Sequence, residues 1–203
     1  MKCKIMKSVF LGSGLSIVSL LSVVNASVLT GNLTVDNEYN VYLSTDDNTQ
    51  GILVSADSSW YESEIFTATL AAGTDYFLHV EGIDFSGFEG FLGNFSLDSA
   101  DHLFSNSTAQ LLTNTIDWTV STTGWSNYSN PSSYGDNTAY PWYADTRPAI
   151  DVISAAEWIW SVDDTAQHVY FSTAITAVPA PSTMAIFGLA LAGLAYRRFK
   201  KQA

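Results

Sequence analysis

Aromatic residues with polar neighbours cluster between residues 118 and 143. Four of these rings are candidates for ligand contact: Trp118, Trp125, Tyr134 and Trp142. Sugars present C–H faces that stack on aromatic rings, while nearby Asn and Asp side chains accept hydrogen bonds from sugar hydroxyl groups. The pattern is therefore typical of a carbohydrate-binding surface. The alternative is that the same rings pack a long loop onto the rest of the domain.

Two pairs of acidic residues could supply ligands to a calcium ion: Asp46 with Asp47, and Asp163 with Asp164. Calcium prefers carboxylate and other oxygen ligands, but neither pair has the spacing of an EF-hand loop. Turns rich in Asp and Asn are also common for backbone reasons alone. A structural calcium ion and a pair of ordinary turns are therefore both open, and no other cofactor is expected.

No arrangement of residues indicates catalysis. The three histidines, His79, His102 and His168, are isolated and have no partner at metal-ligand spacing. The chain also lacks a nucleophile elbow, a phosphate loop and a dinucleotide fingerprint. Glycoside hydrolysis depends on two carboxylates roughly 5 to 10 Å apart in space, a distance that the sequence does not reveal. We expect a non-catalytic protein, with a glycoside hydrolase as the enzymatic alternative.

The charge between residues 27 and 177 is strongly negative. This part of the chain holds one cationic residue, Arg147, and all twenty acidic residues, for a net charge of −19. Nucleic acid is excluded as a partner, because no cationic surface exists to neutralise phosphates. The only cysteine, Cys3, lies near the N-terminus, so a disulfide framework is excluded for the remainder. About 150 residues rich in apolar side chains predict one folded domain.

Residues 1–26 have the pattern of a secretory signal peptide. Three lysines precede an apolar run from Val9 to Val24, and small or short residues follow it. We expect cleavage between Ala26 and Ser27. A permanent N-terminal membrane helix is the alternative, but glycines and serines interrupt the apolar run.

Residues 178–203 combine three different segments. A proline-containing stretch is followed by thirteen apolar residues and then by four cations, in the order Val178, Pro179, Ala180, Pro181, Ser182, then 184–196, then Arg197, Arg198, Lys200, Lys201. A helix over residues 181–199 would measure about 28 Å, close to the roughly 30 Å of a hydrocarbon core. We therefore expect a short C-terminal transmembrane helix. Its basic end would stay in the cytoplasm and residues 27–177 would lie outside.

This tail resembles the PEP-CTERM sorting signal, in which a Pro-x-Pro motif, a short apolar helix and a basic end are presented to a membrane-embedded exosortase. Ala180 stands where the family usually has Glu. The resemblance implies an exosortase-type processing enzyme as partner, removal of the tail near Pro179 to Pro181, and association with exopolysaccharide and biofilm. An ordinary C-terminal membrane anchor is the alternative.

The apolar residues between the two ends alternate with period two, which predicts strands. Strands are expected at residues 39–43, 52–55, 65–70, 76–80, 95–97, 116–120, 158–161 and 168–175. The turn at Ala72–Asp75 predicts a hairpin between the third and fourth of them. We expect Trp158 and Trp160 to lie in the core, and residues 121–148 to form a long irregular section. The fold class predicted is all-β, a β-sandwich or jelly roll.

Short motifs spread over residues 30 to 175 resemble galactose-binding-like jelly-roll modules. They include residues 36–43, 66–76, 80–82, 124–125 and 156–161. Such modules commonly bind glycans, often with a structural calcium ion, whereas others serve as spacers. A shared fold alone does not assign a function.

The sequence therefore predicts three segments: a signal peptide at 1–26, an extracellular β-sandwich at 27–177 and a sorting anchor at 178–203. The expected location is the inner membrane as an anchored intermediate, and then the cell surface or extracellular matrix. The first functional hypothesis is a non-catalytic surface or matrix protein associated with extracellular polysaccharide. A dedicated lectin is the second hypothesis and a glycoside hydrolase the third.

Overall fold

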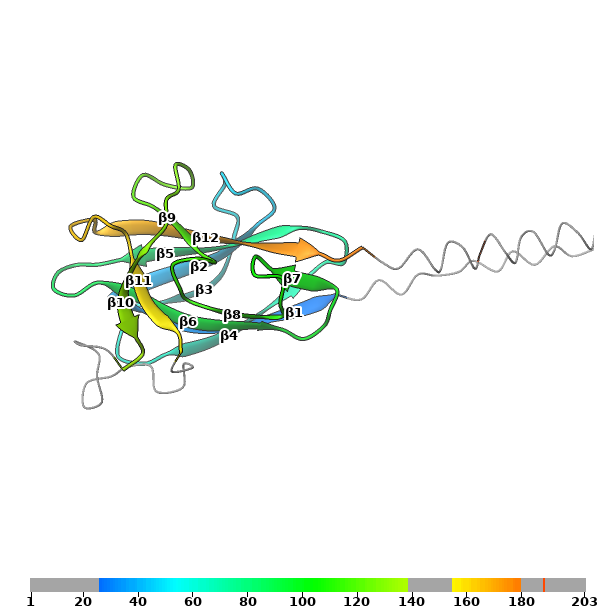
Figure 1. The fold of residues 1–203 in the computed structure, drawn as a ribbon, viewed down its shortest axis with the longest axis horizontal. Coiled ribbons are helices and arrows are strands. Elements are labelled where there is room, and N and C mark those ends of the chain that lie inside the picture. Colours follow the sequence, from blue (N-terminus) through cyan, green and yellow to red (C-terminus); the bar gives the residue numbers. More distant parts are fainter. Residues whose placement is uncertain (1–25, 139–154, 180–187, 189–203) are drawn as a thin grey trace, which may run out of the picture.

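The computed structural model describes residues 26–138, 155–179 and 188, and the described body is a sandwich of two antiparallel sheets (Figure 1). The predicted all-β sandwich is therefore confirmed. The predicted signal peptide and the predicted C-terminal transmembrane helix lie almost entirely outside the described residues. Among the described residues, no helix has the length and apolar character needed to cross a bilayer.

Sheet A contains six strands in the order β10, β11, β6, β1 and β4, with β8 pairing to β6 beside this path. Their bounds are β1 Ser27–Asp36, β4 Glu64–Leu70, β6 Gly90–Leu97, β8 Gln110–Leu112, β10 Ser132–Asp136 and β11 Glu157–Trp160. The central strand β1 pairs with β4 on one side and with β6 on the other. Strand β4 is one edge of this sheet.

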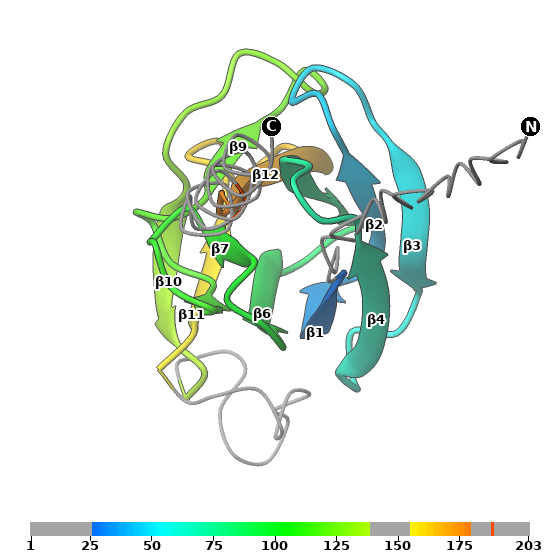
Figure 2. The ribbon, with the colours of Figure 1, turned by 90° about the vertical axis from the view of Figure 1, so that its right-hand side faces the viewer.

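Sheet B also contains six strands, in the order β3, β2, β5, β12 and β7, with β9 pairing to β12. Their bounds are β2 Glu38–Ser44, β3 Ile52–Asp57, β5 Tyr76–Ile83, β7 His102–Phe104, β9 Thr119–Ser121 and β12 His168–Ala177. Strand β3 is an edge of this sheet, as β4 is of the other. Figure 2 shows these two edges on the same side of the body.

The core lies between the two sheets and is formed by alternate residues of their strands. It contains Leu29 and Leu33 of β1, Val80 of β5 and Phe171 of β12, all fully buried. Burial of each such side chain contributes roughly 1.5 to 3 kcal/mol. The predicted burial of Trp158 and Trp160 is confirmed, since both side chains are fully buried. Trp160 belongs to this core, whereas Trp158 lies in a separate small cluster with Leu92 and Ala156. Period-two alternation is therefore the property of the sequence that produces the sandwich.

The predicted hairpin between residues 65–70 and 76–80 is wrong. Strand β4 pairs with β1 in sheet A, whereas β5 pairs with β2 and β12 in sheet B. The turn between them does form, with the Thr74 N–H donating to the carbonyl of Ala71. It carries the chain from one sheet to the other, because both strands bury one face in the same core. A local turn signal does not distinguish these two connections.

The predicted strand at residues 116–120 is also wrong at its first three positions. The side-chain oxygen of Asn114 accepts hydrogen bonds from the N–H groups of Ile116 and Asp117, which holds this stretch as a turn. Ile116 is consequently exposed, and the strand begins only at Thr119. Strand β1 was not among the predicted strands, and β10 lies inside the section expected to be irregular.

The first and last residues of the body lie at the same end (Figure 1). His102 of β7 connects them: its backbone pairs with Ala177, and its Nδ1 lies 2.7 Å from the Ser27 hydroxyl oxygen. The N–H of Ala177 also donates to the Asp75 carboxylate at 2.8 Å. The predicted leader and the predicted tail are therefore joined to the body at neighbouring points.

Candidate functional site

The outer face of sheet B carries a regular array of polar and aromatic side chains. The strand register places Asn40, Glu81 and Tyr170 side by side on β2, β5 and β12. The next row along the same strands consists of Tyr42, His79 and Ser172. Because side chains alternate across a strand, both rows point away from the core formed by Val80 and its neighbours.

Glu81 lies at the centre of this array. Its Oε2 accepts hydrogen bonds from the Asn40 amide at 3.2 Å and from the Tyr42 hydroxyl at 3.3 Å. Its Oε1 lies 3.7 Å from Nδ1 of His168, whose side chain is 54% exposed. Oε2 is thus held by protein donors, whereas Oε1 faces His168, and the Glu81 side chain itself is 16% exposed. An oxygen in that position can accept a hydrogen bond from a hydroxyl group of a ligand.

Trp125 covers one side of the array. Its ring stacks on His79 with the ring centres 4.3 Å apart, and it meets Tyr42 and Tyr170 edge to face at 5.9 Å and 5.0 Å. These contacts fix the orientation of Trp125 although it lies on a loop after β9. Tyr42 and Tyr170, which Trp125 contacts, also lie beside Glu81, and this combination of apolar ring surface and a few polar groups is characteristic of ligand sites.

A buried polar cluster supports Trp125 from below. The side chain of His79 is fully buried, and its Nε2 lies 3.2 Å from Oδ1 of Asp47. The same carboxylate oxygen accepts a hydrogen bond from the Ser172 hydroxyl, and the Tyr128 hydroxyl donates to the Asp47 carbonyl at 3.0 Å. The loop after β2 and the loop after β9 are therefore joined to the same two strands.

The tyrosines of the array are neutral near neutral pH. Burial, followed by the nearby Glu81 carboxylate, raises the pKa of both Tyr42 and Tyr170 above the ordinary value for tyrosine. Burial also raises the pKa of Tyr128, with a further contribution from Asp47. Each hydroxyl group is consequently a hydrogen-bond donor.

The structure separates the four aromatic residues predicted for ligand contact. Trp118 is fully buried between the sheets, with its ring 5.1 Å from Phe91, so its assignment to ligand contact is wrong. Trp125 lies in the array on sheet B. Tyr134 belongs to β10 of the other sheet, where its hydroxyl donates to Glu89 at 2.7 Å. Trp142 lies outside the described residues.

The acidic pairs predicted for calcium occupy two separate loops. Asp46 accepts hydrogen bonds from the backbone and side chain of Asn48, and Asp47 is bound in the buried cluster with His79. Asp163 accepts from the N–H and hydroxyl of Thr165, and these bonds lower its pKa. Asp164 follows in the same loop. The described part of the chain holds no group of three or more His, Cys, Asp or Glu that could bind a metal.

Glu81, Asn40 and Tyr170 were not singled out by sequence reasoning. Each belongs to a predicted strand or adjoins one that was interpreted mainly through its apolar partners. The available signal was the alternation itself: the residues opposite the core positions of three strands form one face. Which three strands are neighbours, however, depends on the pairing of Asn40 with Glu81, 41 positions away, and of Glu81 with Tyr170, 89 positions away.

The predicted sorting residues lie where the body ends. The N–H of Val178 donates to the carbonyl of Asp101 at 2.8 Å, and Pro179 is the last described residue of this stretch. Ala180, Pro181, Ser182 and the cations Arg197, Arg198, Lys200 and Lys201 lie outside the described residues. At the other junction, Ala26 is exposed and Ser27 is fully buried.

Comparison with known protein families matches residues 177–201 to the PEP-CTERM protein-sorting motif. The tail is a PEP-CTERM sorting motif. This motif marks the chain as an exported protein that an exosortase-type enzyme sorts, by way of a membrane-anchored intermediate. No curated protein and no solved structure matches the chain. The resemblance to galactose-binding-like modules therefore has no support from these comparisons, and the PEP-CTERM assignment rests on the tail.

Proposed function

We propose that the body of this PEP-CTERM protein binds extracellular polysaccharide without catalysis, through the array on sheet B. The observation that carries the proposal is the Glu81 carboxylate, which lies beside Tyr42 and Tyr170, the two tyrosines that Trp125 contacts edge to face. Aromatic rings offer surfaces for sugar C–H groups, and a carboxylate oriented by neighbouring donors accepts sugar hydroxyl hydrogen bonds. A body with a net charge of −19 repels acidic polymers, so the expected partner is a neutral polysaccharide.

The test uses the full chain in mild detergent and immobilised neutral glucans, galactans and mannans, with an acidic uronan for comparison. Trp125→Ala and Glu81→Gln should each weaken binding to a neutral polymer at least ~10-fold, the loss expected for roughly 1.4 kcal/mol. Controls away from the array are Tyr61→Ala, which removes an exposed ring, and Glu62→Gln, which removes an exposed carboxylate. If the two site variants bound the polymer as strongly as the two control variants, the assignment of the binding site to the array on sheet B would be refuted.

A dedicated lectin is the second candidate, and the buried cluster beneath Trp125 favours it. A face held in place by Asp47, His79 and Ser172 is preorganised, and preorganisation increases affinity for one ligand shape. A lectin would bind one glycan of the panel strongly and the others weakly. A matrix protein of broad affinity would bind several neutral polymers to similar extents.

We further propose that the protein has no glycoside hydrolase activity. No described feature other than the abundance of carboxylates favours hydrolysis. Incubation of the full chain with each polymer, followed by measurement of reducing ends, should show no increase over buffer. An increase that a single Asp→Asn or Glu→Gln substitution removes would establish the enzyme instead.

We also infer that residues 1–26 are a cleaved signal peptide and that the apolar part of the tail spans the membrane until an exosortase removes it. The position of both junctions at one end of the body supports this inference, because both segments would then meet the same membrane. Mass spectrometry of the mature protein from cells with and without the exosortase provides the test. We expect Ser27 at the N-terminus and a C-terminus near Pro179 only when the exosortase is present.

A further inference from the structure

The row of Asn40, Glu81 and Tyr170 continues onto a fourth strand of sheet B, β9. The register places Ser121 of β9 directly opposite Tyr170 of β12. Residues opposite each other in an antiparallel pair project to the same face, and the preceding residue, Val120, belongs to the core. Ser121 therefore ends the row on the outer face. At the usual spacing of strands, the row measures about 14 Å from Asn40 to Ser121, long enough for a short oligosaccharide.

A cavity of about 240 Å³, which we call the β9 pocket, lies at the Ser121 end of this row. Its lining comes from residues between 120 and 129, in β9 and the loop that follows it, and from residues 161–163 after β11. Trp125 lies on the first of these loops, so one loop carries both a ring of the array and a wall of the pocket. Figure 1 shows both loops in the half of the body away from the two junctions.

Hydroxyl groups dominate the lining of the β9 pocket. Five side chains supply them and Asn127 adds an amide, while the apolar surface is limited to two valines. A hydroxyl group both donates and accepts hydrogen bonds, as the hydroxyl groups of a sugar do. The five hydroxyl residues are Ser121, Thr122, Thr123, Ser129 and Ser161. The lining therefore matches the chemistry of a sugar ring, which presents hydroxyl groups and a smaller area of C–H groups.

Local hydrogen bonds orient the two buried serines of the pocket. Ser121 and Ser161 are each 3% exposed. The Ser161 hydroxyl donates to the carbonyl of Asp163, and the Ser121 oxygen accepts from the N–H of Thr123 at 3.1 Å. Because a hydroxyl oxygen has two lone pairs, Ser161 can still accept a hydrogen bond from a ligand. Polar groups held in this way are preorganised, which lowers the cost of binding.

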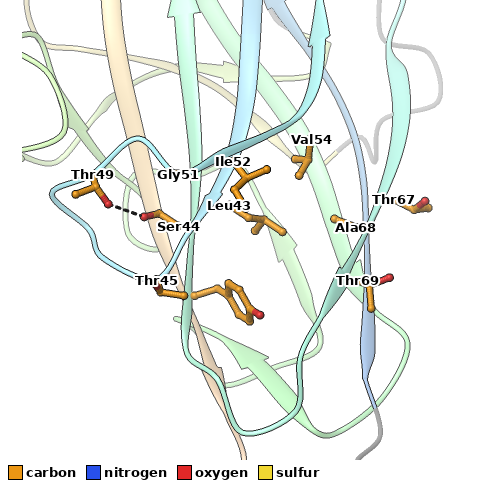
Figure 3. Close-up of a pocket in the computed structure, with 11 residues that line it drawn as sticks. Leu43, Ser44, Thr45, Thr49, Gly51, Ile52, Val54, Thr67, Ala68 and Thr69 are labelled. Carbon is orange, nitrogen blue, oxygen red and sulfur yellow. Dashed lines mark hydrogen bonds between the residues drawn. The ribbon is translucent and has the colours of Figure 1, made fainter.

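The lining disfavours other classes of small ligand. No cationic side chain is among the described residues that line the pocket, so an anion would not be neutralised. Among the same residues Asp163 is the one carboxylate, and it already accepts from the N–H and hydroxyl of Thr165, which disfavours a metal ion. The cleft in Figure 3 differs, because Leu43, Ile52 and Val54 give it an apolar surface. A neutral ligand rich in hydroxyl groups is the class that fits the β9 pocket.

We propose that the β9 pocket holds the terminal sugar of a neutral polysaccharide whose next units lie along the row from Tyr170 to Asn40. This inference rests on the proposed function, to which it adds recognition of a chain end. Sites for drug-sized molecules measure roughly 300 to 1,000 Å³, and the pocket is smaller, so it suits one sugar ring. The protein should therefore bind chain ends rather than internal segments.

Competition tests the recognition of chain ends. The full chain in mild detergent is bound to an immobilised linear neutral polysaccharide, and soluble competitors are added. A partial hydrolysate of the same polymer contains more ends per unit mass than the intact polymer. At equal mass, the hydrolysate should therefore compete more strongly, in proportion to its number of ends. Equal or weaker competition by the hydrolysate would overturn the inference and leave binding by the array intact.

Two substitutions test the residues of the pocket. Asn127→Gly removes the amide, and glycine tolerates the positive φ of 56° at this position. Thr123→Val removes an exposed hydroxyl group. Each should weaken binding of a short oligosaccharide about 2- to 10-fold, the loss expected for one hydrogen bond. The matched controls are Ser107→Gly, at the other described non-glycine residue with positive φ, and Thr67→Val on β4, and both should leave binding unchanged.

Comparison with the array variants separates this inference from the proposed function. If Trp125→Ala and Glu81→Gln weaken binding but Asn127→Gly and Thr123→Val do not, the pocket holds no sugar and the proposed function stands alone. If the two pocket variants alone weaken binding, the pocket holds the sugar and the array does not bind it. No loss of binding in any of the four variants would overturn both.

Discussion

Trp118 lies between the two sheets and Trp125 on the outer face of sheet B, and the two side chains differ in their surroundings and in their burial. Trp118 is fully buried against Phe91 and Phe95, and its indole N–H donates to the carbonyl of Leu112 at 3.1 Å. Trp125 lies against His79, Tyr42 and Tyr170, and its side chain is not fully buried. They lie only seven positions apart in the sequence. The difference shows that residue type and polar neighbours do not determine whether a ring is buried between the sheets or lies on an outer face.

The largest expected effect comes from removing each ring in turn. Trp118→Ala should lower the free energy of unfolding by about 3 to 5 kcal/mol, because it leaves a cavity in the core. Trp125→Ala should cost less than half as much and should reduce polysaccharide binding instead. Urea titration of both variants measures the difference. Similar losses of stability would show that Trp125 is as structural as Trp118.

A smaller effect is expected from overfilling the core. A Cβ atom on Gly82 would lie 2.8 Å from Cη2 and Cζ3 of Trp160 and 3.2 Å from Val169. Gly82→Ala should therefore cost about 1 to 3 kcal/mol, measured by urea titration.

Trp160→Phe provides the control for that prediction, because it replaces the indole that the new methyl group would contact with a smaller ring. The double variant should lose less stability than the sum of the two single variants. If the losses of stability of the two single variants were strictly additive in the double variant, the contact with Trp160 would not be the cause of the loss in Gly82→Ala.

At alkaline pH, a tyrosine in the interior should contribute more to the loss of stability than a tyrosine on the outer face. We expect this effect to be smaller than those above. Burial, assisted by the carboxylates of Asp57 and Glu64, raises the pKa of Tyr39 from 10.0 to about 12. The folded protein therefore holds this proton more tightly than the unfolded chain. The corresponding stability is fully present below pH 10 and is lost as the pH rises toward 12.

Thermal unfolding between pH 8 and pH 12 measures this loss. Tyr39→Phe should flatten the decrease above pH 10 more than Tyr170→Phe does, since Tyr39 is only 2% exposed. An equal effect of the two substitutions would contradict the contrast between the two regions.

The smallest effect is expected from calcium. Asp47 already binds His79 and Ser172, and Asp163 already binds Thr165, so the predicted ligands have protein partners. We expect the midpoint of thermal unfolding to be the same in calcium chloride and in EDTA. A clear rise in calcium that Asp163→Asn removes would assign a site to the loop after β11.

The candidate site was only partly predictable. Trp125 was identified because an indole among Gly, Ser and Asn has few local apolar neighbours. Glu81 was not, since a single acid in a strand of an acidic protein has nothing in the sequence to distinguish it. The failure of the predicted hairpin has the same origin. A turn of four residues fixes the direction of the chain locally, but burial against distant strands decides which sheet each strand joins.

The sequence by itself determined three properties of this protein: the period-two pattern of a β-sandwich, a body of −19 without cationic surface, and a sorting motif at residues 177–201. These properties depend on residue type and short spacing, which a chain carries whether or not it is folded. Tertiary structure decided the rest. It placed Asn40, Glu81 and Tyr170 in one row, buried Trp118, and left β3 and β4 as edges. Strand order joins residues far apart in the chain, and only the packing of the whole core selects it.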